Sequence, residues 1–423
     1  MAIAAPIDDT PGPARATAYG WAVFALSFGL LMSDYMARQV LNAVNPLLKV
    51  EWSLSDAELA SLSSVVSLAV GLLTLPLSLA ADRFGRVRSL TAMALLWSFA
   101  TLGGAMAQSY GQMLGARLLV GVGEAAYGSV GIALVLSVFP VTMRATLSSA
   151  FLAGTIIGQV AGVAIGGTVA ASHGWRASFE AIGLFGLVLA LAYPLVVREA
   201  RIGLIPPREK LDLARLARQL LGRRELQLTY LGSGIQCFCT GTMAVFLPSL
   251  FNRYYGMAVG KAGATTALYL LICAAGMIGC GIAGDRLARR DPNKLPLLAA
   301  SYALASALLF ALTFMIAPGN AQLVLLGGAL LIMAGVPGIA GAIVANQTPR
   351  PIHGTAMATL ALGNNLVGLA PGPLIIGWLA DRMTLITALK FLPVPALLSA
   401  LAFLAVRRAL ATNEISAPTE RAV

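Results

Sequence analysis

Twelve long apolar runs dominate the chain. Each is about 20 residues or longer, which is the length of an α-helix that crosses the hydrocarbon core of a bilayer. A helix satisfies its own backbone hydrogen bonds inside lipid, where an irregular segment cannot. The runs therefore predict an all-α polytopic membrane protein with twelve transmembrane helices. The predicted spans are 19–47, 57–81, 88–107, 110–138, 145–172, 176–197, 227–251, 262–284, 294–316, 321–346, 352–380 and 384–406.

The composition agrees with a membrane protein and argues against a soluble one. Of the 423 residues, 58% are hydrophobic and only 11% are charged. A soluble domain needs more polar and charged side chains to cover its surface. The four cysteines fall inside predicted spans without the spacing of a metal site, so we interpret them as buried thiols. Two histidines, His173 and His353, are too few for a multi-histidine centre, and we expect neither metal nor cofactor.

The spans form two groups of six that are separated by one long polar stretch. The N-terminal residues lack the basic and apolar parts of a cleaved signal peptide, so we expect a disordered tail. Leucines of the polar stretch gather loosely on one side of a helix, which predicts an amphipathic segment on the membrane surface. The predicted organisation is a tail (1–18), a six-helix bundle (19–198), a linker (199–226), a second six-helix bundle (227–406) and a second tail (407–423).

Basic residues are distributed unevenly among the loops. Of the 29 Lys and Arg residues, 21 lie in the two tails and the even-numbered loops, and six lie in the odd-numbered loops. Loops on the cytoplasmic side carry such an excess. We therefore predict a protein of the plasma (cell inner) membrane with both termini in the cytoplasm. Basic residues at the cytoplasmic surface, next to the membrane lipids, account for the net charge of +11. We therefore do not infer a nucleic-acid partner.

A short basic loop occurs at the same place in both groups of spans. Residues 78–88 and residues 281–290 share a small residue, then Asp-Arg, then a further Arg. A small residue lets two helices approach closely, and the carboxylate and arginines can form charge-assisted hydrogen bonds at a helix–loop–helix corner. The repeat predicts two pseudo-symmetric bundles. It also predicts a role in conformational gating for Asp82, Arg83, Arg86, Asp285 and Arg286.

Glycines recur at four-residue steps in the fifth and eleventh spans. The fifth span has Gly154, Gly158, Gly162 and Gly166, and the eleventh has a looser series that begins at Gly368. Small residues at this spacing make a flat helix face. Close packing and a sliding or rocking contact both fit the pattern.

A few charged residues lie deep inside the first and fourth spans. Asp34 and Arg38 are four residues apart, and Asn42 continues their row, while Arg117 and Glu124 are seven apart. Each set shares one face of its helix. An ionised side chain at the centre of a membrane helix costs about 2.5–3.5 kcal/mol. The sequence therefore predicts that these charges meet one another.

Two interpretations of the buried charges remain. They could form an ion-pair network that only fixes helix packing, or they could form a protonation switch. Buried ion pairs stabilise poorly compared with apolar replacements, which favours the second. Desolvation favours the neutral form of a carboxyl group and a nearby arginine favours the charged form, so small movements change its proton occupancy. We predict Glu124 as the main proton carrier and Asp34 as the second, with Arg38 and Arg117 in the same coupling group.

The second six spans carry no ionised residue near their centres but offer several polar and aromatic side chains. Amides at lipid depth need partners, so hydrogen bonding between helices is one interpretation and substrate contact is the other. With the first-half candidates included, the predicted substrate-binding residues are Arg38, Asn42, Tyr127, Gln236, Thr240, Phe246, Asn364 and Asn365.

Several short motifs resemble those of one transporter family. They are Arg38-Gln-Val-Leu, Leu54-Ser-Asp56, Asp82-Arg83, the run from Arg117 to Ala125, Gly174-Trp-Arg176, the run from Thr240 to Ser249, and the run from Gly377 to Arg382. On these the chain resembles the spinster-type transporters of the major facilitator superfamily.

The resemblance implies alternating-access transport of lipid-like substrates, such as lysophospholipids or phosphorylated sphingoid bases, often with proton coupling. It also implies that an Asp-Arg pair in the first helix works with the glutamate of the fourth. Arg38 and Glu124 match these positions. The position of the aspartate holds Ala37, and Asp34 lies one turn earlier.

We therefore predict a monomeric, proton-coupled secondary active transporter that moves an amphipathic, anionic organic or lysolipid-like substrate. One alternative is a proton symporter for a small organic acid, and another is a non-transporting membrane sensor or scaffold. A lateral gap between the fifth and eighth spans with an apolar wall would favour a lipid, and a small closed polar pocket would favour an acid. We do not expect an enzyme, because the buried acids have no nucleophile or metal partner.

Overall fold

The structure is all-helical, as predicted. This computed structural model describes residues 17–140, 143–199, 220, 222–349 and 352–416, and every regular element in them is a helix. Eleven helical stretches among these residues are long and apolar enough to cross a membrane. A further helix, α3 (Arg86–Ala105), has 20 residues and packs between α4 and α7. Together they correspond to the twelve spans expected from the sequence.

The described residues of the first half form seven α-helices. They are α1 (Ala18–Glu51), α2 (Asp56–Phe84), α3, α4 (Tyr110–Glu124), α5 (Tyr127–Ser137), α6 (Arg144–His173) and α7 (Trp175–Val196). The fourth predicted span is thus divided into α4 and α5, and the division falls directly after Glu124. The central helix α1 packs against α6 and α7, and α3 packs against α4 and α7.

The second half contains more interruptions than the sequence predicts. Its elements are α9 (Arg224–Tyr255), α10 (Val259–Arg290), η3 (Pro292–Lys294), α11 (Leu295–Met315), α12 (Asn320–Met333), α13 (Val336–Gln347), α14 (His353–Gly363), η5 (Asn364–Leu369), α15 (Pro371–Ala380), α16 (Leu385–Leu389) and α17 (Pro393–Ser416). The eleventh predicted span includes η5, a π-helix of six residues. Pro371 and Pro373 follow it directly, and proline cannot donate the backbone hydrogen bond that a regular helix requires.

The predicted domain boundaries are tested only in small part. Most of the linker at 199–226 and the first 16 residues lie outside the described residues, so the amphipathic segment and the disordered tail stay predictions. Two described positions refine the boundaries. Helix α9 begins at Arg224, inside the predicted linker, and α17 continues to Ser416, inside the predicted C-terminal tail.

The repeated basic loop of the first half makes a tight turn. Gly85 separates α2 from α3 with a φ of 98°, a conformation that residues with a side chain rarely adopt. The carboxylate of Glu199 then accepts hydrogen bonds from the backbone N–H groups of Arg86 (2.7 Å) and Val87 (3.0 Å). A residue that follows the last helix of the first half thus caps the start of α3.

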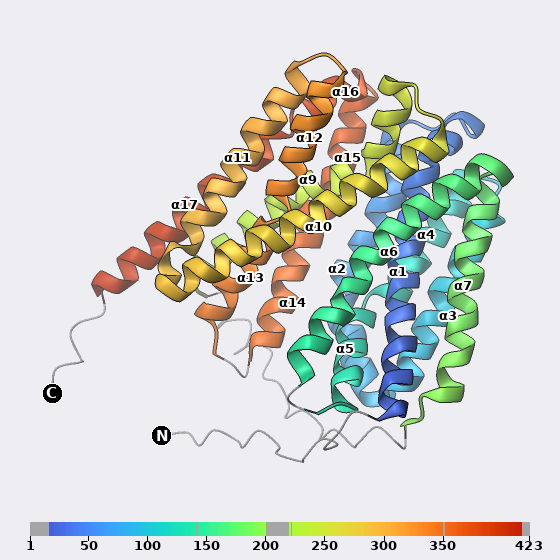
Figure 1. The fold of residues 1–423 in the computed structure, drawn as a ribbon, viewed down its shortest axis with the longest axis horizontal. Helices are drawn as coiled ribbons and strands as arrows, with labels where there is room; N and C mark the ends of the chain where they lie inside the picture. Colours follow the sequence, from blue (N-terminus) through green and yellow to red (C-terminus); the bar gives the residue numbers. More distant parts are fainter. Residues whose placement is uncertain (1–16, 141–142, 200–219, 221, 350–351, 417–423) are drawn as a thin grey trace.

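The two halves meet mainly at the end of the molecule that lies opposite the start of α1 and the end of α17. We call this the distal end, and we call the end where α1 starts and α17 stops the terminal end (Figure 1). Helix α6 packs against α10, and α2 packs against α15 and η5. The ribbons of the two halves diverge toward the terminal end.

The glycine rows of the sequence mark close helix contacts. A Cβ atom on Gly158 would lie 2.5 Å from the carbonyl oxygen of Met32, and one on Gly162 would lie 2.8 Å from Cα of Met36. These glycines join α6 to α1 within the first half. Gly167, at the distal part of the same helix, instead faces Gly263 of α10 in the other half. Close packing therefore explains the row toward α1, and a rocking role for the contact with α10 stays a prediction.

Candidate functional site

Three of the four predicted charged residues come together inside the first half. The Nε atom of Arg38 lies 2.5 Å from Oε2 of Glu124 and 3.6 Å from Oδ1 of Asp34. Asp34 and Arg38 lie one turn apart on α1, and Glu124 is the last residue of α4. We call Asp34, Arg38 and Glu124 the charge cluster.

Burial differs among the members of the charge cluster. The side chain of Glu124 is 0% exposed and that of Asp34 is 4% exposed, whereas that of Arg38 is 21% exposed. Of these three side chains, only that of Arg38 is exposed enough to contact a solute. Burying an ionised carboxylate is costly unless a partner compensates it. One guanidinium here serves two buried carboxyl groups, so a proton on either acid would relieve the imbalance.

Arg117 does not join the charge cluster. It is fully buried, and its NH1 atom donates a 2.8 Å hydrogen bond to the carbonyl oxygen of Ala37 on α1. Its guanidinium lies 4.8 Å from the centre of the Phe179 ring. Among the described residues, no carboxylate oxygen lies within 4.0 Å of a guanidinium nitrogen of Arg117, so it forms no ion pair there. Arg117 ties α4 to the backbone of α1, and its part in proton coupling stays a prediction.

A row of polar side chains follows the charge cluster across three helices. Asn42 donates to Gln39 (2.8 Å), Ser63 of α2 donates to Asn42 (2.8 Å), and Gln39 makes a longer contact with Gln159 of α6 (3.5 Å). We call Gln39, Asn42, Ser63 and Gln159 the polar row. Of these four residues, only Asn42 is among the substrate-binding residues predicted from the sequence. The rule that amides inside a membrane seek partners could have found Gln39, which follows Arg38 directly, and Gln159.

Several of the second-half candidates bond to neighbouring helices. Gln236 donates to Ser306 (3.2 Å), and Ser233 donates to Asn364 (2.8 Å). Asn365 of η5 donates to the carbonyl oxygen of Ala361 at the end of α14. The geometry of Gln236 and Asn364 is that of hydrogen bonding between helices. Substrate contact by these residues and by Thr240 stays a prediction.

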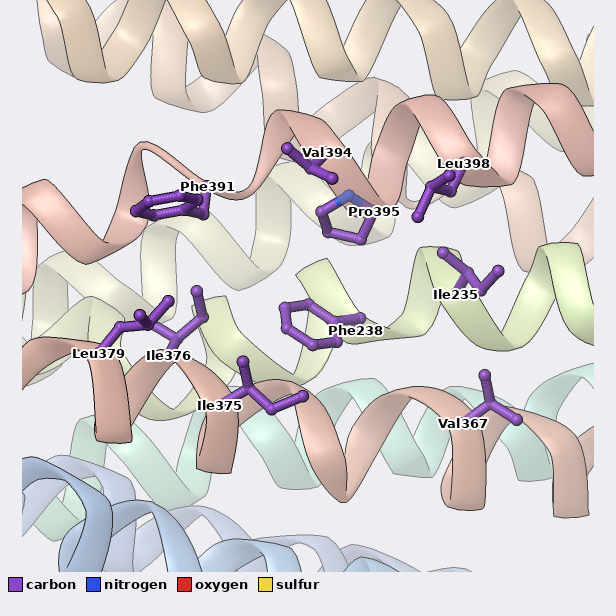
Figure 2. A pocket seen from close by; sticks show the side chains of 10 residues that line it. All are labelled: Ile235, Phe238, Val367, Ile375, Ile376, Leu379, Phe391, Val394, Pro395 and Leu398. Carbon is purple, nitrogen blue, oxygen red and sulfur yellow. The ribbon is translucent and has the colours of Figure 1, made fainter.

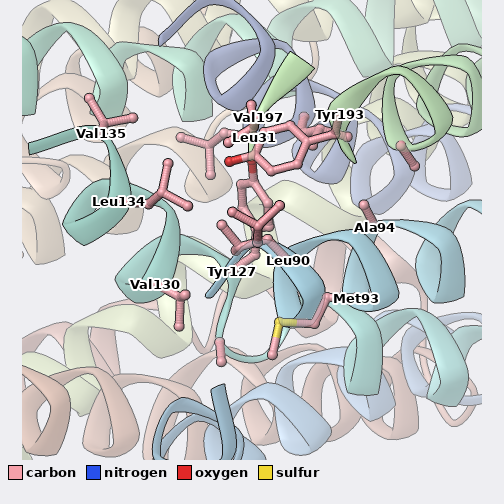
Figure 3. Packing of buried hydrophobic residues seen from close by; sticks show 14 of the residues in the cluster. Leu31, Leu90, Met93, Ala94, Tyr127, Val130, Leu134, Val135, Tyr193 and Val197 are labelled. Carbon is pink, nitrogen blue, oxygen red and sulfur yellow. The ribbon is translucent and has the colours of Figure 1, made fainter. Parts of the chain in front are cut away.

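Two aromatic candidates lie in packed cores. Tyr127 is fully buried in the first half, where Figure 3 shows it among apolar side chains, and its hydroxyl donates to the carbonyl oxygen of Ser27. Phe246 is fully buried in the second half. Neither ring can touch a solute in this conformation, because surrounding side chains enclose it. Substrate contact by either residue in another conformation stays a prediction.

The predicted gating loops lie on the molecular surface. The side chains of Arg83, Asp285 and Arg286 are exposed, and that of Asp82 lies outside the described part of the chain. The backbone of Arg86 is bonded to Glu199, as described above. The gating role of these five residues stays a prediction.

An apolar cavity of about 330 Å³ lies in the second half, between α9, α15 and α17. Figure 2 shows the rings of Phe238 and Phe391 and the side chain of Ile375 among its lining residues. No lining residue comes from the first half, so this cavity is separate from the charge cluster. A lateral gap between the fifth and eighth spans would have favoured a lipid; among the described residues, α6 and α10 instead pack closely at Gly167 and Gly263 in this conformation.

Comparison with known proteins places the chain among transporters. A family model for the Major Facilitator Superfamily matches residues 26–340. Protein spinster homolog 1 of Homo sapiens is 25% identical over 377 residues, which cover 83% of this chain and 71% of that protein. The probable L-galactonate transporter of Escherichia coli is 27% identical over 278 residues, 62% of this chain and 61% of that protein, so the match spans about three fifths of that relative.

A solved structure shares the whole fold. The crystal structure of a bacterial homolog to the human lysosomal transporter Spinster, in an inward-facing and unoccupied conformation, superposes with a TM-score of 0.82. The two chains are 19% identical, and the superposition covers 94% of this chain and 98% of the other.

Proposed function

This chain belongs to the Major Facilitator Superfamily, and from that premise we propose that it couples substrate movement to protons by alternating access. The family makes it a multi-pass membrane protein and a secondary transporter rather than an enzyme. The coupling ion, the substrate class and the orientation in the membrane are our proposals.

The observation that carries the proposal is the contact of Arg38 with two buried carboxyl groups. While Glu124 and Asp34 are both ionised, they compete for one guanidinium. A proton on Glu124 weakens its hold on Arg38, which leaves the arginine available to an anionic group of a substrate. Release of the substrate returns Arg38 to Glu124 and favours loss of the proton. Proton binding and substrate binding are then linked through one side chain.

We propose an amphipathic, anionic substrate of the lysolipid-like class. Arg38 supplies a partly exposed cation, and the polar row supplies hydrogen-bonding groups beside it. Sites near the middle of the membrane, between the two repeats, are typical of such transporters. The similarity to spinster homologs supports the same class.

A small organic acid is the second candidate. The polar row favours it, because four amide and hydroxyl side chains beside Arg38 suit a substrate with hydroxyl groups next to its carboxylate. The similarity to the probable L-galactonate transporter supports this reading. The two candidates differ in whether an alkyl chain adds to binding.

We propose that the termini face the cytoplasm of the plasma membrane, following the excess of basic residues in the tails and even-numbered loops. The distal end then faces outward. The contacts between the halves at that end correspond to a conformation closed to the outside. We propose a monomer as the working unit.

Proton movement should accompany substrate movement in liposomes that contain the purified protein. A pH-sensitive dye inside the vesicles should change its signal when a lysophospholipid or galactonate is added outside, and a protonophore should abolish the change. Thermal-shift screening of both compounds first shows which one binds. Flux of the binding compound that ignores an imposed pH gradient would refute proton coupling. Stabilisation by galactonate alone would favour the small-acid candidate.

A further inference from the structure

We propose that four charged residues at the distal end form a latch that holds the two halves together and sets the balance between the two transport conformations. Lys49 and Asp56 belong to the first half, and Arg253 and Asp381 belong to the second. We call these residues the distal latch. It rests on the proposed alternating access, and its test reads conformation rather than flux.

Asp381 caps a helix of the other half. Its carboxylate accepts hydrogen bonds from the backbone N–H groups of Asp56 (2.5 Å) and Ala57 (3.0 Å), the first two residues of α2. A helix N-terminus leaves such N–H groups without partners and carries a partial positive charge, so a carboxylate suits it. The next groups are bonded within the first half, where Ser55 and Glu58 form a reciprocal capping box. The start of α2 is therefore capped partly by its own half and partly by the other.

The side chain of Asp56 makes the second link between the halves. It is 5% exposed, and Arg253 of α9 approaches it with both terminal nitrogens, at 2.9 Å and 2.6 Å. Such two-point contact between guanidinium and carboxylate is the strongest geometry for an ion pair. Lys49 adds a third contact from the same half, at 2.8 Å. Asp381 of the second half thus binds the N-terminus of α2, and Asp56 of the first half binds Arg253 of the second.

Glycines allow the halves to approach closely around the distal latch. A Cβ atom on Gly377 of α15 would lie 2.6 Å from the carbonyl oxygen of Asp56. A Cβ atom on Gly263 would lie 2.9 Å from the carbonyl oxygen of Val163 on α6. Opening the distal end must separate these surfaces and break both links of the latch. The freed groups are charged or polar, so water can solvate them, which makes the contact reversible.

The distal latch is distinct from the loops that the sequence pointed to. Those loops, with Arg83 and Asp285, lie on exposed surface, whereas the latch joins α2, α9 and the end of α15. Loss of one charge-assisted link should shift the balance toward the distal-open conformation by about tenfold or more.

Cysteine cross-linking tests the latch directly. Ala171 of α6 and Gly260 of α10 face each other across the halves, since a Cβ atom on Gly260 would lie 3.2 Å from Cβ of Ala171. That spacing is close to the Cβ separation of a disulfide. The double variant A171C/G260C, with Cys237, Cys239, Cys273 and Cys280 replaced by alanine, should cross-link rapidly under mild oxidation.

Asp381→Ala in this background should lower the cross-linking rate about tenfold or more, and Arg253→Gln should lower it similarly. Asp291→Ala is the matched control: Asp291 also caps a helix, the η3 turn, but within the second half. The cross-linking rate of the Asp291→Ala variant should equal that of the parent protein. If Asp381→Ala yields no folded protein, Arg253→Gln decides alone. Equal rates in the parent and the latch variant that folds overturn the latch. The assay uses no substrate and no pH gradient, so failure of proton coupling at Glu124 would leave its result unaffected.

Discussion

Glu124→Gln is expected to abolish proton-driven accumulation of substrate while leaving exchange of substrate across the membrane intact. Glutamine keeps the shape of the side chain and one of its oxygens but cannot bind or release a proton. With one coupled proton, each unit of pH difference can sustain a substrate gradient of about tenfold, since one unit equals about 1.4 kcal/mol. The variant should bring substrate only to equal concentration on both sides.

The contact geometry makes this prediction specific to Glu124. Its side chain is fully buried and lies closest to Arg38, whereas Asp34 lies 3.6 Å from the same nitrogen. In the variant, Asp34 remains as the partner of Arg38, so the protein should still fold and bind substrate. Accumulation and counterflow measured in the same proteoliposomes separate the coupled step from the exchange step.

Glu180→Gln is the control for the loss of an acid. Glu180 lies on α7 in the same half, but its side chain is exposed. Substrate accumulation by the Glu180→Gln variant should match that of the parent protein. A full response of Glu124→Gln to an imposed pH gradient would remove Glu124 as the carrier, and the same measurement on Asp34→Asn would then test the second acid.

Gly158→Ala should destabilise the first half strongly, although it adds a single methyl group. The added carbon would lie 2.5 Å from the carbonyl oxygen of Met32 and 2.9 Å from Cβ of Tyr35. The first of these atoms is backbone, so α1 and α6 must move apart to admit it. Overpacking of this kind typically costs about 1–3 kcal/mol. A thermal unfolding measurement on the purified protein should show a clear fall in melting temperature.

The matched control is Gly115→Ala on α4. This glycine is exposed, and nothing lies within 4 Å of the position that its Cβ would take. Alanine forms helices better than glycine by about 1 kcal/mol, so the melting temperature should stay the same or rise. Equal effects of the two substitutions would contradict the close contact between α1 and α6.

The sequence was sufficient for those features that follow from local spacing. Apolar runs of the length of a membrane revealed the helices, because each helix must cross the bilayer by itself. The four-residue step from Asp34 to Arg38 placed both on one face of α1, and the charge cluster contains both.

The same spacing rule did not reveal the partner of Arg117. Seven residues return a side chain to the same face of a helix but move it about 10 Å along the axis. Arg117 therefore shares a direction with Glu124 at a different depth, where the nearest acceptor is the carbonyl oxygen of Ala37. Periodicity gives the direction of a side chain, whereas its partner depends on what the facing helix presents at that level.

Contacts between distant parts of the chain left no local signal. Asp381 follows the eleventh predicted span, whereas its partners, Asp56 and Ala57, lie at the start of the second predicted span. No pattern within either segment points to the other. The other three members of the polar row were missed for a related reason. Gln159 appears in the sequence as a single amide among glycines, and only the packing of α6 on α1 brings it to Gln39.

The tight contact of α6 with α1 has a mechanical consequence. Gly158 and Gly162 leave no space between the two helices, so α1 cannot slide independently of α6. Helix α6 meets the opposite half at Gly167, and α1 carries Arg38. The pair therefore moves as one body. Any separation of α6 from α10 at Gly167 must shift α1, and Arg38 moves with it.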